Sequence, residues 1–191
     1  MISNQGVKLL LSLLGIEHEW QYIDILNGET QTPAFLQINP NGKIPTVQFE
    51  DGRFLAESNA ILTYFAEQTP LLPEDKYHKA KVMEWLFFEQ YSHEPFIAVA
   101  RFIEKYLGMP EERKDEYKSL QSGGHKALAV MEKQLSSSSY LASESLSIAD
   151  IALFAYTHVA HEGGFALQQY PHIQAWLEKV TQHPRYVGML S

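Results

Sequence analysis

Two short segments combine a special backbone with charged side chains and could hold a small ligand that carries both an amine and a carboxylate. In the first, residues 41–45, Lys43 and Ile44 stand before Pro45 at the start of a predicted strand. A cis Ile44–Pro45 bond would turn the chain sharply and present the backbone N–H and C=O of Ile44 to a peptide laid beside it. A trans proline in an ordinary loop is the alternative interpretation.

The second segment, residues 57–61, opens a predicted helix. Ser58 is a typical N-cap residue, and the start of a helix offers N–H groups and a positive dipole end to a carboxylate. Glu57, one residue earlier, could accept a hydrogen bond from a ligand ammonium. The pair therefore predicts a site for a group such as the γ-glutamyl end of glutathione. A plain helix cap with a solvated Glu57 is the alternative.

Composition removes several classes of function. The 191 residues carry a formal net charge of -8 and no cysteine. With no basic cluster, nucleic acid and anionic membranes are poor partners. Without cysteine there are no disulfides, thiolate metal sites or cysteine nucleophiles. We expect no bound metal, and a cytoplasmic location because no export signal is evident in residues 1–6.

The first 68 residues alternate between helix and strand patterns. A helix, a strand, a hairpin and a second helix are predicted over residues 7–14, 18–25, 46–55 and 58–68. The hairpin signal is Asp51-Gly52 between two short runs typical of strands. Pro70 and Pro73 cannot continue the second helix. We therefore place a first domain at residues 1–68 and a linker at residues 69–75.

Beyond the linker only helices are predicted, so residues 76–191 form an all-helical domain and the fold class is α/β plus all-α. The helices are expected over residues 77–107, with a kink at Pro95, and over residues 110–135, 147–160 and 171–183. Ser147 and Asp150 form a capping-box pattern at the start of the third helix. We assign this cap a structural role and expect Asp150→Ala to cost about 1–2 kcal/mol of stability.

Together these segments resemble the cytosolic glutathione S-transferase family, its bacterial members above all. The resemblance covers nearly the whole chain and is carried by residues 9–16, 32–36, 39–45, 57–61 and 147–150. It implies a thioredoxin-like N-terminal domain before the helical one, with glutathione as cosubstrate. By the resemblance, Lys43 and the backbone of Ile44, next to Pro45, would hold the cysteinyl part of glutathione. Glu57 and Ser58 would hold its γ-glutamyl part.

The resemblance also implies an activity and an assembly. The glutathione thiolate would attack small electrophiles, a detoxification reaction, or would reduce peroxides or disulfides. The wall of the electrophile pocket would include Tyr91, His93, Phe96 and Arg101, although aromatic side chains here could equally belong to the core. The family pairs as homodimers through the α/β domain of one subunit and the helical domain of the other. A non-catalytic binding or dimerisation module is the alternative function.

The beginning of the sequence departs from the family pattern. Family members begin with a strand in the middle of the sheet, followed by a loop that carries the residue activating the thiol. Residues 1–6 are too short for both, so we expect the first strand to be missing. The usual activating serine would fall at or before Met1, and Ser3 could take the catalytic role if the loop is shortened.

Overall fold

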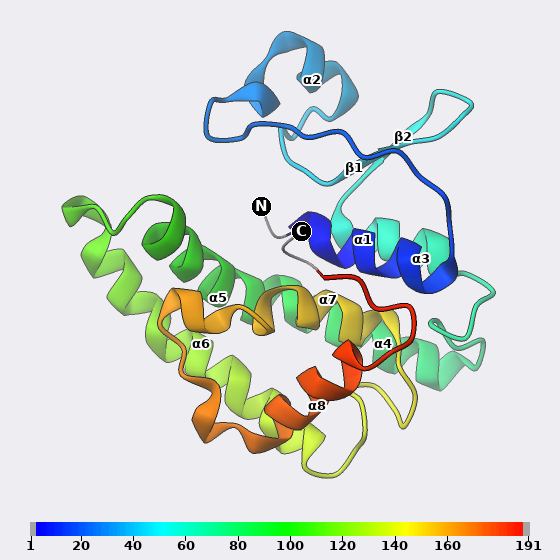
Figure 1. Ribbon diagram of the computed structural model, residues 1–191, viewed down its shortest axis with the longest axis vertical. Coiled ribbons are helices and arrows are strands. Elements are labelled where there is room, and N and C mark those ends of the chain that lie inside the picture. Colours follow the sequence, from blue (N-terminus) through cyan, green and yellow to red (C-terminus); the bar gives the residue numbers. More distant parts are fainter. Residues whose placement is uncertain (1–2, 189–191) are drawn as a thin grey trace.

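The computed structural model describes residues 3–188 and arranges them in two layers, with a small mixed domain above a helical one in Figure 1. The predicted fold class, a small α/β domain followed by an all-helical domain, is confirmed. The elements are α1 (Ser3–Leu14), η1 (Glu29–Gln31), α2 (Pro33–Ile38), β1 (Thr46–Gln48), β2 (Phe54–Ala56), α3 (Ser58–Ala66), α4 (Lys76–Phe88), η2 (Glu89–His93), α5 (Glu94–Arg101), η3 (Phe102–Tyr106), η4 (Glu111–Arg113), α6 (Lys114–Leu135), α7 (Ile148–Thr157), η5 (Ala160–Gly163), η6 (Leu167–Gln169) and α8 (Pro171–Thr181).

The predicted hairpin forms the sheet of the first domain. β1 and β2 pair antiparallel, with Thr46 opposite Ala56. The turn closes where Gly52, at a φ of 83°, donates its N–H to the carbonyl of Phe49 over 2.9 Å. Glycine takes this left-handed conformation without the steric cost that a Cβ would bring.

The strand predicted over residues 18–25 is wrong. This segment runs in an extended path that belongs to no helix or ladder, and Trp20 and Tyr22 are 49% and 76% exposed. The reason is physical: strand residues are stable only where a neighbouring strand takes up their N–H and C=O groups. Between residues 3 and 188 the only strand pairing joins β1 to β2.

Helix α1 holds the two domains together, because it buries opposite faces against each. Val7 and Leu11 pack with Ile61 of α3 below the hairpin. Leu9 and Leu10 belong instead to the large core that α7 dominates. The helix begins at Ser3, four residues before the predicted start, and ends at Leu14.

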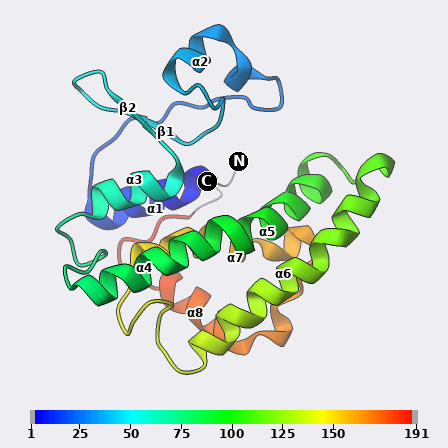
Figure 2. The same ribbon diagram turned by 180° about the vertical axis from the view of Figure 1, so that it is seen from behind.

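The predicted long helix after the linker is present as α4, η2 and α5, which follow one another as one rod in Figure 2. The π-helical turn η2 lies immediately before Pro95, the residue at which a kink was predicted. Proline cannot donate an N–H to the preceding turn, and a π-helical turn is one way in which a helix accommodates this. None of the helices in the described residues is long and apolar enough to cross a membrane.

Helix α6 is continuous through Gly123 and Gly124, in agreement with the helix predicted over residues 110–135. A Cβ on Gly123 would lie 2.2 Å from the ring of Phe96, and a Cβ on Gly124 would lie 2.2 Å from the ring of Phe165. Glycine at these positions lets two aromatic rings rest directly on the helix backbone. The lower helix propensity of glycine is offset by this close packing.

The capping box at the start of α7 is confirmed, and Asp150 does more than cap. Its Oδ2 accepts hydrogen bonds from the backbone N–H and the hydroxyl of Ser147, at 3.0 and 2.9 Å. Its Oδ1 accepts from the backbone N–H of Leu141 and from Nε1 of Trp176, at 2.9 and 3.0 Å. Asp150 is fully buried, so one carboxylate joins α7, the preceding loop and α8.

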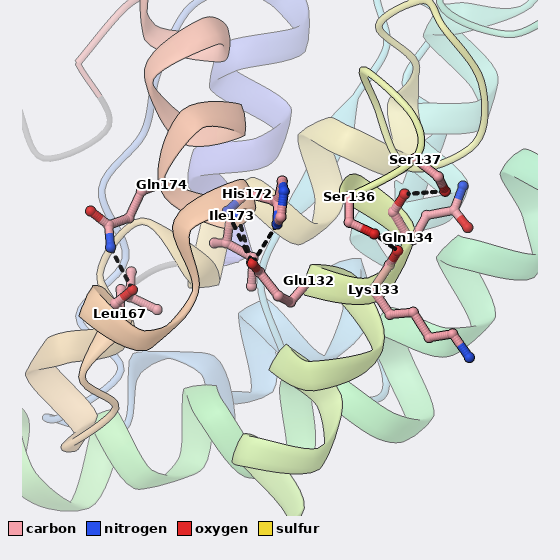
Figure 3. A network of polar contacts seen from close by, with 9 residues as sticks. All are labelled: Glu132, Lys133, Gln134, Ser136, Ser137, Leu167, His172, Ile173 and Gln174. Atoms are coloured by element: carbon pink, nitrogen blue, oxygen red, sulfur yellow. Dashed lines mark hydrogen bonds and ion pairs between the residues drawn. The ribbon is translucent and has the colours of Figure 1, made fainter.

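A second carboxylate joins α6 to the start of α8, as Figure 3 shows. Glu132 accepts hydrogen bonds from the backbone N–H groups of His172 and Ile173, at 3.1 and 3.0 Å, and from Nδ1 of His172 at 2.7 Å. Burial alone would raise the pKa of Glu132, but these donors lower it below its ordinary value. A carboxylate at a helix N-terminus also interacts favourably with the helix dipole.

The domain boundaries that we infer from the sequence stay a prediction. In the structure α3 ends at Ala66 and α4 begins at Lys76, so the predicted linker at residues 69–75 falls within the connection between them. The backbone N–H of Ile148 donates to the carbonyl of Leu71 over 3.0 Å. This bond fastens the connection to the start of α7.

Candidate functional site

The loop before β1 has the conformation that the sequence suggested. The Ile44–Pro45 peptide bond is cis. The side chain of Asn39 supports the loop from beneath, since its Nδ2 donates to the carbonyl of Lys43 over 2.7 Å. Pro45 is buried, whereas Lys43 is exposed.

The register of the hairpin brings this loop beside the start of α3. Because Thr46 pairs with Ala56, one further step along both strands places Pro45 across from Glu57. Asn41 completes the approach, with its Nδ2 donating to Oε1 of Glu57 over 3.3 Å. The two segments singled out in the sequence therefore lie together.

The helix cap differs from the prediction, which placed Ser58 at the N-cap. The N-cap is Glu57, whose carbonyl accepts from the N–H of Ile61 over 2.9 Å, and Ser58 is the first helical residue. Glu57 has a φ of 68°, a value that is rare for a residue with a Cβ. This left-handed turn leads from β2 directly into the helix. The first helical residue is therefore Ser58, whereas an N-cap at Ser58 would have made it Asn59. Strained backbone of this kind is common at ligand sites.

A buried carboxylate of the helical domain holds the start of α3 in place. Nδ2 of Asn59 donates to Oε2 of Glu89 and to the carbonyl of Leu86, at 2.9 and 3.1 Å. Glu89 is 2% exposed, and burial raises its pKa to about 7. Hydrogen bonds from Gln90 and Asn59 act in the opposite direction by favouring the ionised form.

Lys43 approaches the helical domain at Glu94. Burial raises the pKa of Glu94, and the positive charge of Lys43 lowers it in part. Glu94 begins α5 and lines a cavity of about 190 Å³ together with Ala98, Val99, Arg101, Phe102, Tyr106 and Tyr156. The charge of Lys43 in the cis-proline loop therefore acts on a residue of the cavity wall.

The four residues predicted to line an electrophile pocket are not gathered in one place. Only Arg101 lines this cavity. Tyr91 is 85% exposed, and Phe96 packs on Gly123 of α6. His93 is fully buried, with Nε2 2.9 Å from Oγ1 of Thr157, and burial lowers its pKa to about 3. The positions of Phe96 and His93 fit a role in the core, and that of Tyr91 fits a role at the surface, better than a role in an electrophile pocket.

Ser3, the predicted catalytic hydroxyl, is the first residue of α1, and its side chain lies outside what the structure describes. Its role stays a prediction. Within residues 3–188 no three His, Asp or Glu side chains are grouped so as to hold a metal ion.

The sequence interpretation missed Asn41, Asn59, Glu89 and Glu94. A signal for Glu89 was present, because it continues the buried stripe of Val82 and Leu86 on one face of a helix. A carboxylate in such a stripe has a specific partner or a shifted pKa. Asn59 is that partner, but nothing in the sequence alone indicates which residue 30 positions away would meet it.

A two-stranded α/β unit with a cis-proline loop facing a helix start, fused to a helical bundle, defines the class of glutathione-transferase-like folds. Comparison with known families gives the same result. Residues 4–68 match "Glutathione S-transferase, N-terminal domain", and residues 60–184 match "Glutathione S-transferase, C-terminal domain". The chain belongs to the glutathione S-transferase family.

Three known proteins illustrate the similarity. The crystal structure of a glutathione S-transferase from Pseudomonas fluorescens Pf-5 superposes with a TM-score of 0.97 at 59% identity, covering 99% of this chain and 94% of that one. A glutathione transferase from Burkholderia graminis, with two glutathione molecules bound per subunit, gives a TM-score of 0.85 at 27% identity, covering 97% of this chain and 82% of that one. The disulfide-bond oxidoreductase YfcG of Escherichia coli is 29% identical over 188 residues, which are 94% of this chain and 86% of that protein.

Proposed function

We propose that this protein is an enzyme that binds glutathione beside the cis-proline loop and uses its thiolate to conjugate small electrophiles or to reduce peroxides or disulfides. The observation that carries the proposal is that the two segments, residues 41–45 and 57–61, lie side by side and that the second one contacts the helical domain. The relatives support it: one is a glutathione S-transferase, one holds bound glutathione and one is a disulfide-bond oxidoreductase.

Each residue of the site has a proposed role. The backbone of Ile44 and the ammonium of Lys43 hold the cysteinyl part of glutathione. Glu57 accepts hydrogen bonds from the γ-glutamyl ammonium, and Ser58 with the first turn of α3 holds its carboxylate. Ser3 is the proposed donor to the thiolate, whose formation requires a lowered thiol pKa.

Ser58→Ala tests the binding site without disturbing the helix cap. Because Glu57 and not Ser58 is the N-cap, we expect an unchanged melting temperature and an affinity for glutathione weaker by about 0.5–1.5 kcal/mol, the range for one hydrogen bond. Calorimetric titration and thermal melts measure both. Ser119→Ala is a matched control, because the hydroxyl of Ser119 donates only to the carbonyl of Glu116 in its own helix. Equal affinity in both variants contradicts the role of Ser58.

Turnover separates the enzyme from the non-catalytic alternative. Conjugation of glutathione to 1-chloro-2,4-dinitrobenzene is followed together with reduction of a small disulfide by glutathione. We expect at least one of the reactions to proceed, and Ser3→Ala to lower its kcat while glutathione still binds. Glutathione binding without either reaction supports a binding or dimerisation module instead.

We also propose that two copies of the chain form a homodimer through the surface shared by α3 and α4. An apolar groove of about 480 Å³ runs there, with Leu55, Ala60, Met83 and Leu86 among its walls. Phe87 also lines it and is 67% exposed. A projecting aromatic beside an apolar groove is self-complementary about a two-fold axis. The groove is shared by both domains, as the predicted pairing requires.

Phe87→Ser tests this assembly. Sedimentation at micromolar concentration is expected to give a dimer for the unchanged protein and a monomer near 21.8 kDa for the variant. Leu107→Ser, at another exposed apolar residue outside the groove, is the control and should remain dimeric. A monomer for the unchanged protein excludes the assembly. The predicted cytoplasmic location stays a prediction.

A further inference from the structure

The cavity between α5 and α7 contains an arginine whose hydrogen-bonding capacity is not filled. Arg101 is 1% exposed and lines the cavity. Its Nε donates to Glu162 and its Nη1 donates to the hydroxyl of Tyr106 over 3.1 Å. Its Nη2 is buried and has no acceptor among the described residues. A guanidinium stays charged in proteins, and a buried donor of a charged group without an acceptor is costly.

The charges around Arg101 do not cancel. Glu162 accepts hydrogen bonds from both Arg101 and Lys105, so two cations share one carboxylate. Burial alone would raise the pKa of Glu162, but hydrogen bonds from Lys105 and Arg101 lower it, so it is ionised at neutral pH. The cluster therefore keeps one positive charge in excess, and its buried donor belongs to the residue on the cavity wall.

The remaining walls are suited to an apolar body. Ala98, Val99, Phe102 and Tyr156 line the cavity. Its volume of about 190 Å³ compares with the roughly 150 Å³ of an engineered apolar cavity that takes up benzene in another protein. A single substituted ring therefore fits.

Glu94 is the other charged residue of this wall and would repel an anion if it were ionised. Burial raises its pKa, and Lys43 is the cation that faces it. The raised pKa favours the protonated form of Glu94, and the positive charge of Lys43 offsets part of the negative charge of the ionised form. The influence of Lys43 on Glu94 links this wall of the cavity to the proposed glutathione site.

We propose that this cavity takes an electrophile that carries an anionic group, a carboxylate on an apolar body of about one ring, and that the uncompensated positive charge of the Arg101 cluster attracts the carboxylate. The inference rests on the proposed function, since it names the substrate class of the same enzyme. Attraction between opposite charges distinguishes a carboxylate from a neutral group of the same shape, and this makes Arg101 a determinant of specificity.

Binding of glutathione conjugates tests this without requiring turnover. The probes are S-(4-carboxybenzyl)glutathione, its methyl ester on the benzyl carboxylate, and glutathione itself, each titrated calorimetrically. We expect the acid to bind about tenfold or more tightly than the ester, because the attraction between opposite charges near a protein surface is of this size or larger. Equal affinity for acid and ester overturns the inference and leaves the proposed function intact. If neither the conjugates nor glutathione bind, the proposed function fails first and the inference fails with it.

Two sets of variants locate the effect. The double variant Arg101→Met and Glu162→Met removes both members of the ion pair, so that no unpaired carboxylate is left. It should bring the ratio of the affinities for acid and ester near one. Lys105→Met removes the other cation of the same cluster. Because Lys105 does not line the cavity, this variant should preserve most of the preference for acid over ester.

Ala98→Asp keeps the Arg101 cluster intact and covers the case in which the double variant does not fold. It places a carboxylate on the cavity wall and should reduce the ratio about tenfold relative to Ala98→Asn, its neutral counterpart of the same shape. Equal ratios for Ala98→Asp and Ala98→Asn overturn the proposal.

Discussion

Replacing Asp150 by alanine should destabilise the protein far more than the loss of a helix cap. The carboxylate accepts four buried hydrogen bonds, two from Ser147 and one each from Leu141 and Trp176. The hydroxyl of Ser147 can rotate to another acceptor, but three N–H groups remain without one. At roughly 1–3 kcal/mol for each stranded donor the gross cost is about 3–9 kcal/mol.

One term acts in the opposite direction. Burial raises the pKa of Asp150, which means that keeping its charge in the core is itself unfavourable. Alanine removes that cost. We therefore expect the free energy of unfolding to fall by about 3–5 kcal/mol, which is the lower half of the range given above. For a chain of this length this corresponds to a fall in melting temperature of about 6–20 °C.

Urea unfolding at pH 7, followed by circular dichroism and tryptophan fluorescence at one protein concentration, measures the change. Two further variants give a graded series. Ser147→Ala removes one hydroxyl and should cost about 1 kcal/mol. Asp150→Asn keeps one acceptor oxygen for Leu141 and Trp176 and should lie between the other two. A loss of only 1–2 kcal/mol for Asp150→Ala, the value expected from the sequence, would refute the view that this carboxylate joins three segments. Glutathione affinity of the folded fraction should be unchanged.

Three further predictions concern packing and pH. Gly124→Ala should cost about 1–3 kcal/mol in urea unfolding, because its Cβ would overlap the ring of Phe165. Gly6→Ala, where a Cβ would meet its nearest neighbour at 3.7 Å, should instead stabilise helix α1 by about 0.5–1 kcal/mol. Glu89 holds its proton up to a pKa of about 7 in the folded state and up to 4.5 when unfolded, so it should lower the free energy of unfolding by about 3 kcal/mol as pH rises from 4.5 to 7. His93 acts in the opposite direction, because its lowered pKa destabilises the fold as pH falls below 6.5. Subtracting the free energy of unfolding of Glu89→Gln from that of the unchanged protein at each pH removes the His93 contribution. A difference that does not change with pH contradicts the prediction for Glu89.

The sequence predicted those features that local rules determine. The Asp51-Gly52 hairpin, the capping box at Ser147 and the order of the domains each follow from residues within a few positions of one another. The closeness of Pro45 to Glu57 follows from the hairpin register, whereas the cis bond before Pro45 was one of two interpretations of that loop. Local signals of this kind survive in the fold because nothing distant competes with them.

The errors arose where a distant partner decides the outcome. Residues 18–25 have the composition of a strand, but composition cannot supply the neighbour that a ladder requires. Similarly, Tyr91 and His93 lie close in sequence, yet the π-helical turn η2 sends one to solvent and the other into the core.

The proposed glutathione site is best understood as a property of both domains. Its loop and helix start belong to the N-terminal domain, but Asn59 is held by the buried Glu89 of the helical domain. Next to Asn59 in sequence are Ser58 and the strained Glu57, whose orientation depends on where α3 begins. A rotation of the helical domain would therefore move the two residues proposed to hold the γ-glutamyl group. Because α1 also buries one face in each domain, such a rotation would open both cores, and the site is kept rigid by the same packing that stabilises the fold.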